Sequence, residues 1–185
     1  MRLELRDATE GDLPAITALY AREVAGGTAT FETMPPSLEE MTQRFMAVRR
    51  HALPWLAADI DGVFAGYAYL SPFRPRPAYR YGVEVSIYIE AQARRRGVGR
   101  ALLEALIART RDRGLRHLIG AISDSDTSAA SIALHRALGF REAGAYRQVG
   151  WKFGRWLDVT LMQLDLDPEG APPASPGLDL GGGLA

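Results

Sequence analysis

The sequence has no cysteine among its 185 residues, and its acidic and basic side chains are equal in number. Without cysteine, the chain forms no disulfide and no thiolate metal site, and no covalent intermediate rests on a thiol. Because the formal net charge is zero, no global field draws the protein to nucleic acid or anionic lipid. No apolar run is long enough to span a membrane, and Met1-Arg2-Leu3-Glu4 does not begin a signal peptide. We therefore expect a cytoplasmic protein that binds neither nucleic acid nor membrane.

The hydrophobic pattern predicts one mixed α/β (α+β) domain over residues 1–166. The elements follow in the order strand, helix, helix, three strands, helix, strand, helix and two strands. Helices placed after strands predict a mixed sheet with helices on both faces. Residues 167–185 are rich in Pro, Gly, Ala and Ser and bury too little to offset their ordering entropy, so we expect a disordered tail.

The most informative stretch covers residues 83–103. Its first half alternates Val83, Val85, Ile87 and Ile89 with polar or charged residues, which predicts a strand with one buried face. A turn, Arg94-Arg95-Arg96-Gly97-Val98-Gly99, then leads into a helix. The amides of residues 95–100 would lie at the helix start without intrahelical acceptors, where the helix dipole and the arginines favour an anion. The expected ligand is a pyrophosphate.

Two common nucleotide motifs do not fit this turn. A P-loop requires Gly-Lys-Ser/Thr, whereas Gly99 is followed by Arg100 and Ala101. A dinucleotide fingerprint requires Gly or Ala three residues after Gly99, where Leu102 stands. The pattern Arg-x-x-Gly-x-Gly after an apolar strand instead resembles the pyrophosphate loop of the GNAT acetyltransferases, which holds coenzyme A.

Four segments in the same order resemble the phosphinothricin N-acetyltransferase family within that superfamily. They are TATFE (28–32), AYRYGVEVSIYI (78–89), ASIALH (130–135) and VGWKFGRWLDV (149–159). The resemblance covers nearly everything from residue 3 to residue 166. It implies a GNAT fold, in which helices flank a central, mixed, mostly antiparallel twisted sheet. It further implies acetyl-CoA as co-substrate, no metal, and a homodimer whose candidate contact region is residues 139–158. The family acetylates the α-amine of phosphinothricin, and often of methionine sulfoximine or methionine sulfone.

Glu84 and His135 are the candidate catalytic residues, and each has two interpretations. Glu84 is either paired with a nearby arginine or a general base, since an amine must lose a proton before it attacks a thioester. His135 shares a helical stripe with Ser128 and Ser131. It is either a structural histidine or the residue that stands where many GNAT enzymes have a tyrosine, thought to protonate the leaving thiolate. Both choices stay open from the sequence.

Other roles follow from the resemblance by position. The backbone of Ile87, Tyr88 and Ile89 would pair with the pantetheine arm. The residues that would hold the pyrophosphate are Arg94, Arg95, Arg96, Gly97, Val98, Gly99 and Arg100. The family commonly has an asparagine that bonds the cofactor at the position of Ser128. In this chain Ser128 would act through water, or Asp124 or Asp126 would replace it, with Ser131 beside it.

The substrate contacts are inferred from residue type. Arg74 and Arg80 can give forked hydrogen bonds to a carboxylate or a polar head group. Phe31, Phe73 and Tyr79 would form a wall beside the aliphatic part. We expect Arg76 to be solvated. Lys152 and Trp156 would reach the site or only a dimer contact.

The sequence therefore predicts direct attack of an amino acid's α-amine on acetyl-CoA. Glu84 would take the proton of the amine, a backbone amide of the central strand would bond the carbonyl oxygen, and His135 or a water would protonate the sulfur. One alternative is a GNAT acting on another amine, such as a protein N-terminus or a polyamine, although the arginines near Glu84 disfavour a polyamine. The other is a non-catalytic acetyl-CoA-binding module, which needs the loop at residues 94–99 but neither Glu84 nor His135.

Overall fold

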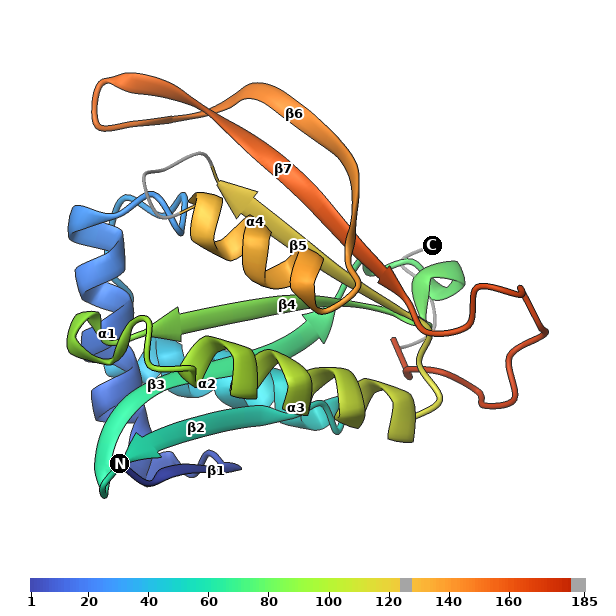
Figure 1. The fold of residues 1–185 in the computed structure, drawn as a ribbon, viewed down its shortest axis with the longest axis horizontal. Helices are drawn as coiled ribbons and strands as arrows, with labels where there is room; N and C mark the ends of the chain where they lie inside the picture. The colour runs from blue at the N-terminus through green and yellow to red at the C-terminus, as the bar shows by residue number, and fades with distance from the viewer. Residues whose placement is uncertain (124–127, 181–185) are drawn as a thin grey trace.

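The computed structural model describes residues 1–123 and 128–180, and it contains a seven-stranded sheet between helices (Figure 1). The strands are β1 (Leu3–Asp7), β2 (Trp55–Ile60), β3 (Val63–Pro72), β4 (Gly82–Ile89), β5 (His117–Ser123), β6 (Arg141–Lys152) and β7 (Arg155–Asp165). The helices are α1 (Leu13–Gly26), α2 (Leu38–Arg50), α3 (Val98–Asp112) and α4 (Ser128–Ala137). Three short 3-10 turns, η1 (Glu10–Asp12), η2 (Pro77–Tyr79) and η3 (Ala91–Ala93), complete the described elements. This order of strands and helices confirms the prediction.

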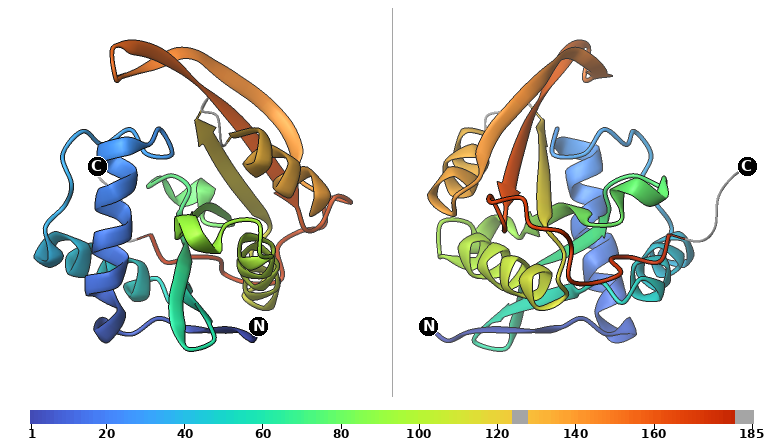
Figure 2. Two further views of the ribbon diagram at one scale, coloured as in Figure 1. Left: turned by 60° about the vertical axis from the view of Figure 1, so that its left-hand side comes forward. Right: turned by 90° about the vertical axis from the view of Figure 1, so that its right-hand side faces the viewer.

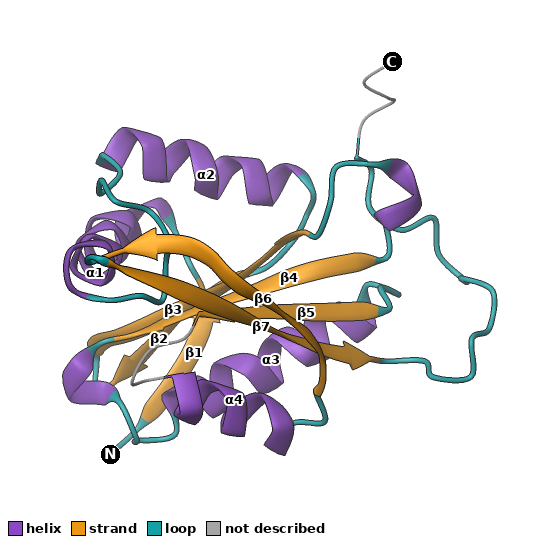
Figure 3. Ribbon diagram, turned by 90° about the horizontal axis from the view of Figure 1, so that it is seen from above, coloured by secondary structure: helices purple, strands orange, loops and turns teal. Residues whose placement is uncertain are grey.

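The sheet runs in the order β1-β2-β3-β4-β5-β7-β6. Among the described strands, β4 and β5 are parallel, and the other neighbouring pairs are antiparallel. Helices α1 and α2 cover one face, and α3 and α4 cover the other (Figure 3). The predicted mixed, mostly antiparallel sheet with helices on both faces is therefore confirmed.

Local sequence signals account for several turns and helix ends. Asp61 and Gly62 both have positive φ, 51° and 79°, which is the geometry of a two-residue hairpin turn. Ser37 caps α2 by accepting a hydrogen bond from the Glu40 amide at 3.1 Å. Asp12 holds the N-cap position, but its carboxylate instead accepts from the Thr9 amide at 2.8 Å and from Arg6 at 2.7 Å.

The core lies on both faces of the sheet. Ile16 and Phe45 are fully buried under α1 and α2, and Leu102 and Leu106 are fully buried under α3. Burial of side chains of this size contributes about 1.5–3 kcal/mol each, which fixes the helices on the sheet. No helix in the part of the chain that the structure describes is long and apolar enough to cross a membrane.

The two parallel strands separate along their length. Gly82–Val85 of β4 pair with His117–Gly120 of β5, and the pairing ends there. Beyond this point β5 pairs only with β7 and diverges from β4 (Figure 1). On the side that faces β5, backbone groups of residues 86–89 of β4 therefore point into a gap in the sheet. On the other side, the same residues pair with β3.

The long β6–β7 hairpin projects beyond the rest of the sheet (Figure 2). The sequence predicts two strands at the end of the domain, and the first of them, β6, extends over twelve residues. Its register shifts twice against β7, once between Glu142 and Gly144 and once between Tyr146 and Gly150. Bulges of this kind bend the strand in which they occur.

The segment after β7 makes contacts that the sequence does not predict. Residues 167–180 contain no helix or strand, yet Leu178 is only 2% exposed and its amide donates to the Arg80 carbonyl at 2.9 Å. The Tyr81 hydroxyl donates to the Ser175 carbonyl at 3.0 Å. Leu180, which is partly buried, also packs against the core. Residues 181–185 lie outside the described part, and disorder of the segment in solution stays a prediction.

Candidate active site

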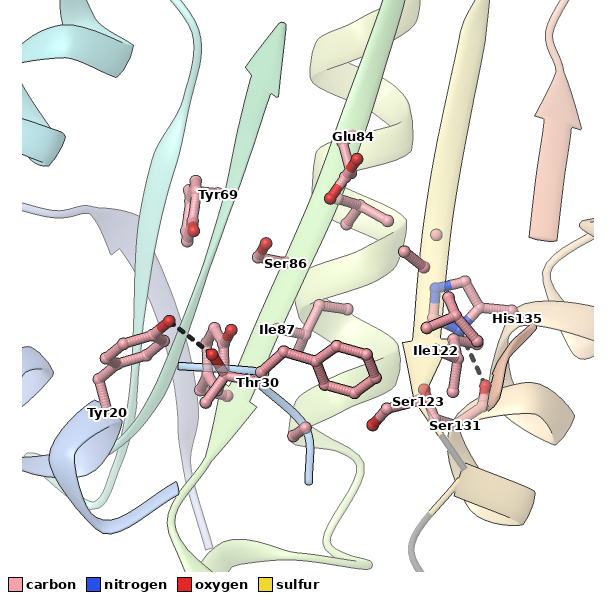
Figure 4. Close-up of a pocket in the computed structure, with 17 residues that line it drawn as sticks. Tyr20, Thr30, Tyr69, Glu84, Ser86, Ile87, Ile122, Ser123, Ser131 and His135 are labelled. Carbon is pink, nitrogen blue, oxygen red and sulfur yellow. Dashed lines mark hydrogen bonds between the residues drawn. The ribbon is translucent and has the colours of Figure 1, made fainter. Parts of the chain in front are cut away.

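A cavity of about 400 Å³ opens where β4 and β5 separate (Figure 4). Its lining comes from α1, the loop after α1, the strands β3, β4, β5 and β7, and α4. The lining residues are Tyr20, Ala29, Thr30, Phe31, Tyr69, Glu84, Val85, Ser86, Ile87, Tyr88, Gly120, Ala121, Ile122, Ser123, Ser131, His135 and Val159. The volume is within the usual range for a small-molecule site. Both candidate catalytic residues are therefore in one cavity.

Glu84 reaches the cavity from β4 (Figure 4). Burial raises the pKa of its carboxyl, and the charge of Arg74 lowers it, with burial the stronger influence. Within the described ranges, Glu84 makes no ion pair with Arg74 or any other cation. The interpretation of Glu84 as a salt-bridged structural residue therefore loses its support. A half-buried carboxylate with a raised pKa is suited to accept a proton.

His135 is 5% exposed, and its ring nitrogens have different surroundings. Nδ1 lies 2.8 Å from the Ser131 carbonyl oxygen, which can only accept, so Nδ1 carries the hydrogen (Figure 4). Nε2 has no partner among the described residues and faces Gly120, where a Cβ would approach it to 3.0 Å. Burial lowers the pKa of the imidazole. A neutral ring with a bare Nε2 accepts hydrogen bonds beside the cavity.

The turn before α3 has the geometry of an anion site. Gly97 is the N-cap of α3 with φ of 84°, a conformation that favours glycine. The amides of Val98, Gly99 and Arg100 follow in the first turn and have no intrahelical acceptor. A Cβ on Gly97 would meet nothing within 4 Å, so the chain leaves space beside this glycine. This backbone is compatible with the predicted pyrophosphate loop, whose role stays a prediction.

The arginines of this turn are used differently from one another. Arg94 donates to Glu23 at 2.6 Å and to the Ile89 carbonyl at 3.3 Å, so it fastens the turn to α1 and β4. Arg95 and Arg96 are exposed, and Arg100 makes a 3.4 Å ion pair with Glu104. Arg95 and Arg96 are thus better candidates than Arg94 for contact with a bound anion. The guanidinium of Arg94 already bonds to Glu23 and to the Ile89 carbonyl.

The other residues predicted to contact the cofactor lie on β4 and on α4. Ile87 and Tyr88 line the cavity on the unpaired edge of β4, where pantetheine amides could bond to the backbone. Ile89 ends that strand. Ser131 also lines the cavity. Ser128 begins α4, but its side chain, like Asp124 and Asp126, lies outside the described residues. Their predicted contacts stay predictions.

Of the predicted substrate residues, Phe31 and Glu84 line the cavity, and the others lie on the loop between β3 and β4. The Arg74 guanidinium lies 5.0 Å over the Phe73 ring, which meets Tyr79 edge-on at 5.7 Å. Arg80 is turned elsewhere, since its Nε donates to the Pro77 carbonyl at 2.8 Å. Arg74, whose charge already acts on Glu84, is therefore the better candidate for a substrate carboxylate.

Several lining residues escaped the sequence analysis. Ser86 shares the polar face of β4 with Glu84, so the strand's alternation could have indicated it. Tyr69 on β3 is paired directly opposite Ser86 on the adjacent strand β4, which no local pattern reveals. Tyr20 joins the site through its hydroxyl, which lies 2.8 Å from Thr30 Oγ1 and donates to Glu32 at 2.8 Å (Figure 4).

Comparison with known proteins agrees with this geometry. The model of the acetyltransferase (GNAT) domain matches residues 5–161. A phosphinothricin N-acetyltransferase of Alcaligenes faecalis is 48% identical over 88% of this chain and 82% of its own length. An L-methionine sulfoximine/L-methionine sulfone acetyltransferase of Pseudomonas paraeruginosa is 44% identical over 94% of this chain and 100% of its own. The crystal structure of a phosphinothricin acetyltransferase from Sinorhizobium meliloti in complex with AcCoA superposes with a TM-score of 0.89, at 44% identity and 94% coverage of both chains.

Proposed function

This chain belongs to the GNAT acetyltransferase family, and from that premise we propose that it acetylates the α-amine of a small amino acid of the phosphinothricin, methionine sulfoximine or methionine sulfone type. The observation that carries the proposal is the position of Glu84. Its carboxylate, without an ion pair among the described residues, enters a cavity at the gap between β4 and β5. An amine held there would meet a base.

The residues present fit acetyl-CoA, which would supply the thioester-bound acetyl group. The amides of Val98, Gly99 and Arg100 would hold the diphosphate at the start of α3. The unpaired edge of β4 at residues 86–89 would pair with the pantetheine amides. The gap between the strands would then direct the arm into the cavity. The proposal includes a cytoplasmic location, where acetyl-CoA is available.

The protonation steps follow from the surroundings of each group. Glu84, with its raised pKa, takes the proton of the substrate's ammonium group, directly or through a water. A backbone amide of β4 donates to the acetyl carbonyl oxygen as it gains charge. The amine nitrogen bonds to the acetyl carbon as the C–S bond breaks, and the nitrogen's second proton passes through a water to the leaving sulfur. His135 has no proton on Nε2 at neutral pH, so it would orient that water by accepting a hydrogen bond from it. Between the two sources predicted for this proton, the geometry favours the water.

Substrate recognition would come from the loop before β4 and from the loop after α1. Arg74 would bond the carboxylate or the polar head of the amino acid. Phe31, which lines the cavity, would contact the aliphatic part. A polyamine carries no anionic group for Arg74, which disfavours the polyamine alternative.

A thiol-release assay over a panel of amines tests this proposal. The panel contains phosphinothricin, methionine sulfoximine, methionine sulfone, glutamate, spermidine and a short peptide with a free N-terminus. We expect the highest kcat/KM with the sulfoximine, sulfone or phosphinothricin. A preference for the peptide or spermidine would support the other-amine alternative. Silence with every amine, together with calorimetric binding of acetyl-CoA, would support the non-catalytic module.

We further propose a homodimer that forms through the β6–β7 hairpin. β6 is an edge strand, and Val149, Trp151, Phe153 and Trp156 on the hairpin are each more than half exposed. An edge strand with this much exposed aromatic surface marks a protein–protein contact. The opposite edge, by contrast, ends in the short strand β1.

Replacing Trp156 by glutamate is expected to convert the dimer into a monomer, because it places a charge in the centre of the apolar contact. Light scattering coupled to gel filtration measures the mass. Val63→Glu, at an exposed valine of the β2–β3 hairpin, is the control and is expected to remain dimeric. A monomeric wild type at assay concentration, or equal dissociation of both variants, would contradict the proposed contact.

A further inference from the structure

Lys152 is the single lysine among 22 lysine and arginine residues, and it is buried. Its side chain leaves β6 near the tip of the hairpin and is 5% exposed. The ammonium donates to the Gly27 carbonyl at 2.8 Å and to the Thr30 carbonyl at 2.9 Å. In the described ranges it forms no salt bridge with a carboxylate. The buried ammonium of Lys152 is therefore bound by two main-chain carbonyls more than 120 residues away in sequence.

Those acceptors belong to the loop at residues 27–31, which forms part of the cavity wall. Ala29, Thr30 and Phe31 of this loop line the cavity. On one side the loop is tied to α1, because Thr30 Oγ1 lies 2.8 Å from the Tyr20 hydroxyl. On the other side it is tied to β5, where the Ser123 hydroxyl donates to the Thr28 carbonyl. The loop thus connects α1 with β5.

The hairpin also shapes the position of Phe31 directly. The Phe31 ring lies against Gly150, where an added Cβ would come within 2.2 Å of ring carbon Cε2. Gly150 is on the same strand as Lys152, two residues earlier. The hairpin therefore fixes the main chain of the loop through Lys152 and leaves space for its aromatic side chain at Gly150.

We propose that Lys152 is a positioning residue that holds the 27–31 loop across the cavity and thereby sets the place of Phe31 against the amino-acid substrate. This inference rests on the proposed function. A compact ammonium with three donors can serve two carbonyls in a small space, whereas the planar guanidinium used at the chain's other basic positions would not fit the same pair. The hairpin's role is then to complete the substrate side of the site, separately from the coenzyme side.

The first test separates the two substrates in steady-state kinetics. Lys152→Met keeps the aliphatic stem and removes the donors. We expect the KM for the preferred amino acid to rise about tenfold, since charged hydrogen bonds of this kind are lost. The KM for acetyl-CoA should stay within about twofold, because α3 and the edge of β4 are untouched. Arg155→Met, an exposed cation of the same hairpin, is the control and should change neither. Equal changes of both KM values, or no change, would overturn the proposal.

The second test uses the Phe31–Gly150 contact. Gly150→Ala should raise the amino-acid KM as Lys152→Met does, because the methyl group displaces the ring. Phe31→Ala should raise it as well. The double variant should be no worse than Phe31→Ala alone, since no ring is left to displace. Additive effects would overturn the argument that Gly150 acts through Phe31.

A third test does not depend on activity. Because Lys152 is the only lysine, an amine-reactive ester followed by mass spectrometry reports on this one side chain and the N-terminus. In the native protein Lys152 should react about tenfold or more slowly than after unfolding, and Gly150→Ala should accelerate its reaction whereas Arg155→Met should not. Rapid native labelling would overturn the inference. An inactive wild type with a protected Lys152 would instead reject the proposed function while retaining the fastened loop.

Discussion

Replacing Glu84 by glutamine is expected to lower kcat/KM for the preferred amino acid about 10²- to 10³-fold at neutral pH. A positioned general base contributes on this order to an acyl transfer whose nucleophile starts as an ammonium ion. Glutamine keeps the size and hydrogen-bonding capacity of the side chain but cannot take the proton. The KM for acetyl-CoA should change little, because Glu84 lies apart from the turn that begins α3.

The pH profile provides the sharper measurement of Glu84. In the wild type, kcat/KM should fall as the pH drops through the pKa of Glu84, which burial raises above its usual 4.5. The glutamine variant should lack this step and keep only the dependence on the amine. Glu90→Gln is a matched control, since Glu90 follows the same strand and pairs with Arg22 outside the cavity. Full turnover of the Glu84 variant across pH would remove Glu84 from the mechanism.

A folding defect can be separated from this catalytic effect by the sign of the linkage. The folded-state pKa of Glu84 lies above that of the unfolded chain, so its contribution to the free energy of unfolding is present at low pH. This contribution is lost as the pH rises from the unfolded pKa through the folded one. The glutamine variant should therefore be at least as stable as the wild type at pH 7, as thermal melts can show.

The second large effect is expected at Gly97, where aspartate should weaken acetyl-CoA binding about a hundredfold. The carboxylate would lie at the start of α3, in the space where the diphosphate is proposed to bind. Like charges a few ångströms apart near a protein surface repel strongly enough for a change of this order. Calorimetric titration of acetyl-CoA measures it, and the loss should shrink as salt is added.

Gly97→Asn provides the matched control for this experiment. Asparagine and aspartate tolerate the positive φ of Gly97 about equally well, so backbone strain is shared by the two variants. The asparagine variant should bind acetyl-CoA within a few-fold of the wild type. Aspartate should also favour the start of α3 through the helix dipole, so its melting temperature should not fall below that of the asparagine variant. Equal affinities of the two variants would place the diphosphate elsewhere.

The residues in and around the cavity would have different roles, catalytic for some and positioning for others. Glu84 would act on the proton of the substrate, His135 would act through a water, and Lys152 would act only through the loop that it holds. Each role therefore has its own signature. Loss of Glu84 changes the pH profile, whereas loss of the Lys152 donors changes the KM for one substrate only.

Several features of the molecule could be predicted because they depend on neighbours in the chain. Asp61-Gly62 forms a hairpin turn because both positions accept positive φ. The alternation along β4 places Glu84 on the polar face, and Gly97 with Gly99 starts α3 with free amides. Even the resemblance to an acetyltransferase family was carried by short continuous segments. These signals predicted the element order, the candidate anion site and the candidate base.

Only the tertiary structure decided how distant residues meet. Arg94 pairs with Glu23 beside the candidate anion site, and Leu178 packs on the domain although it stands in a Pro- and Gly-rich segment. Gly120 makes room for His135, and Lys152 finds its acceptors on a loop at the other end of the chain. The physical reason is that periodicity and turn chemistry act over a few residues. Strand pairing and burial, in contrast, set which side chain faces which across more than a hundred positions, and no local pattern carries that information.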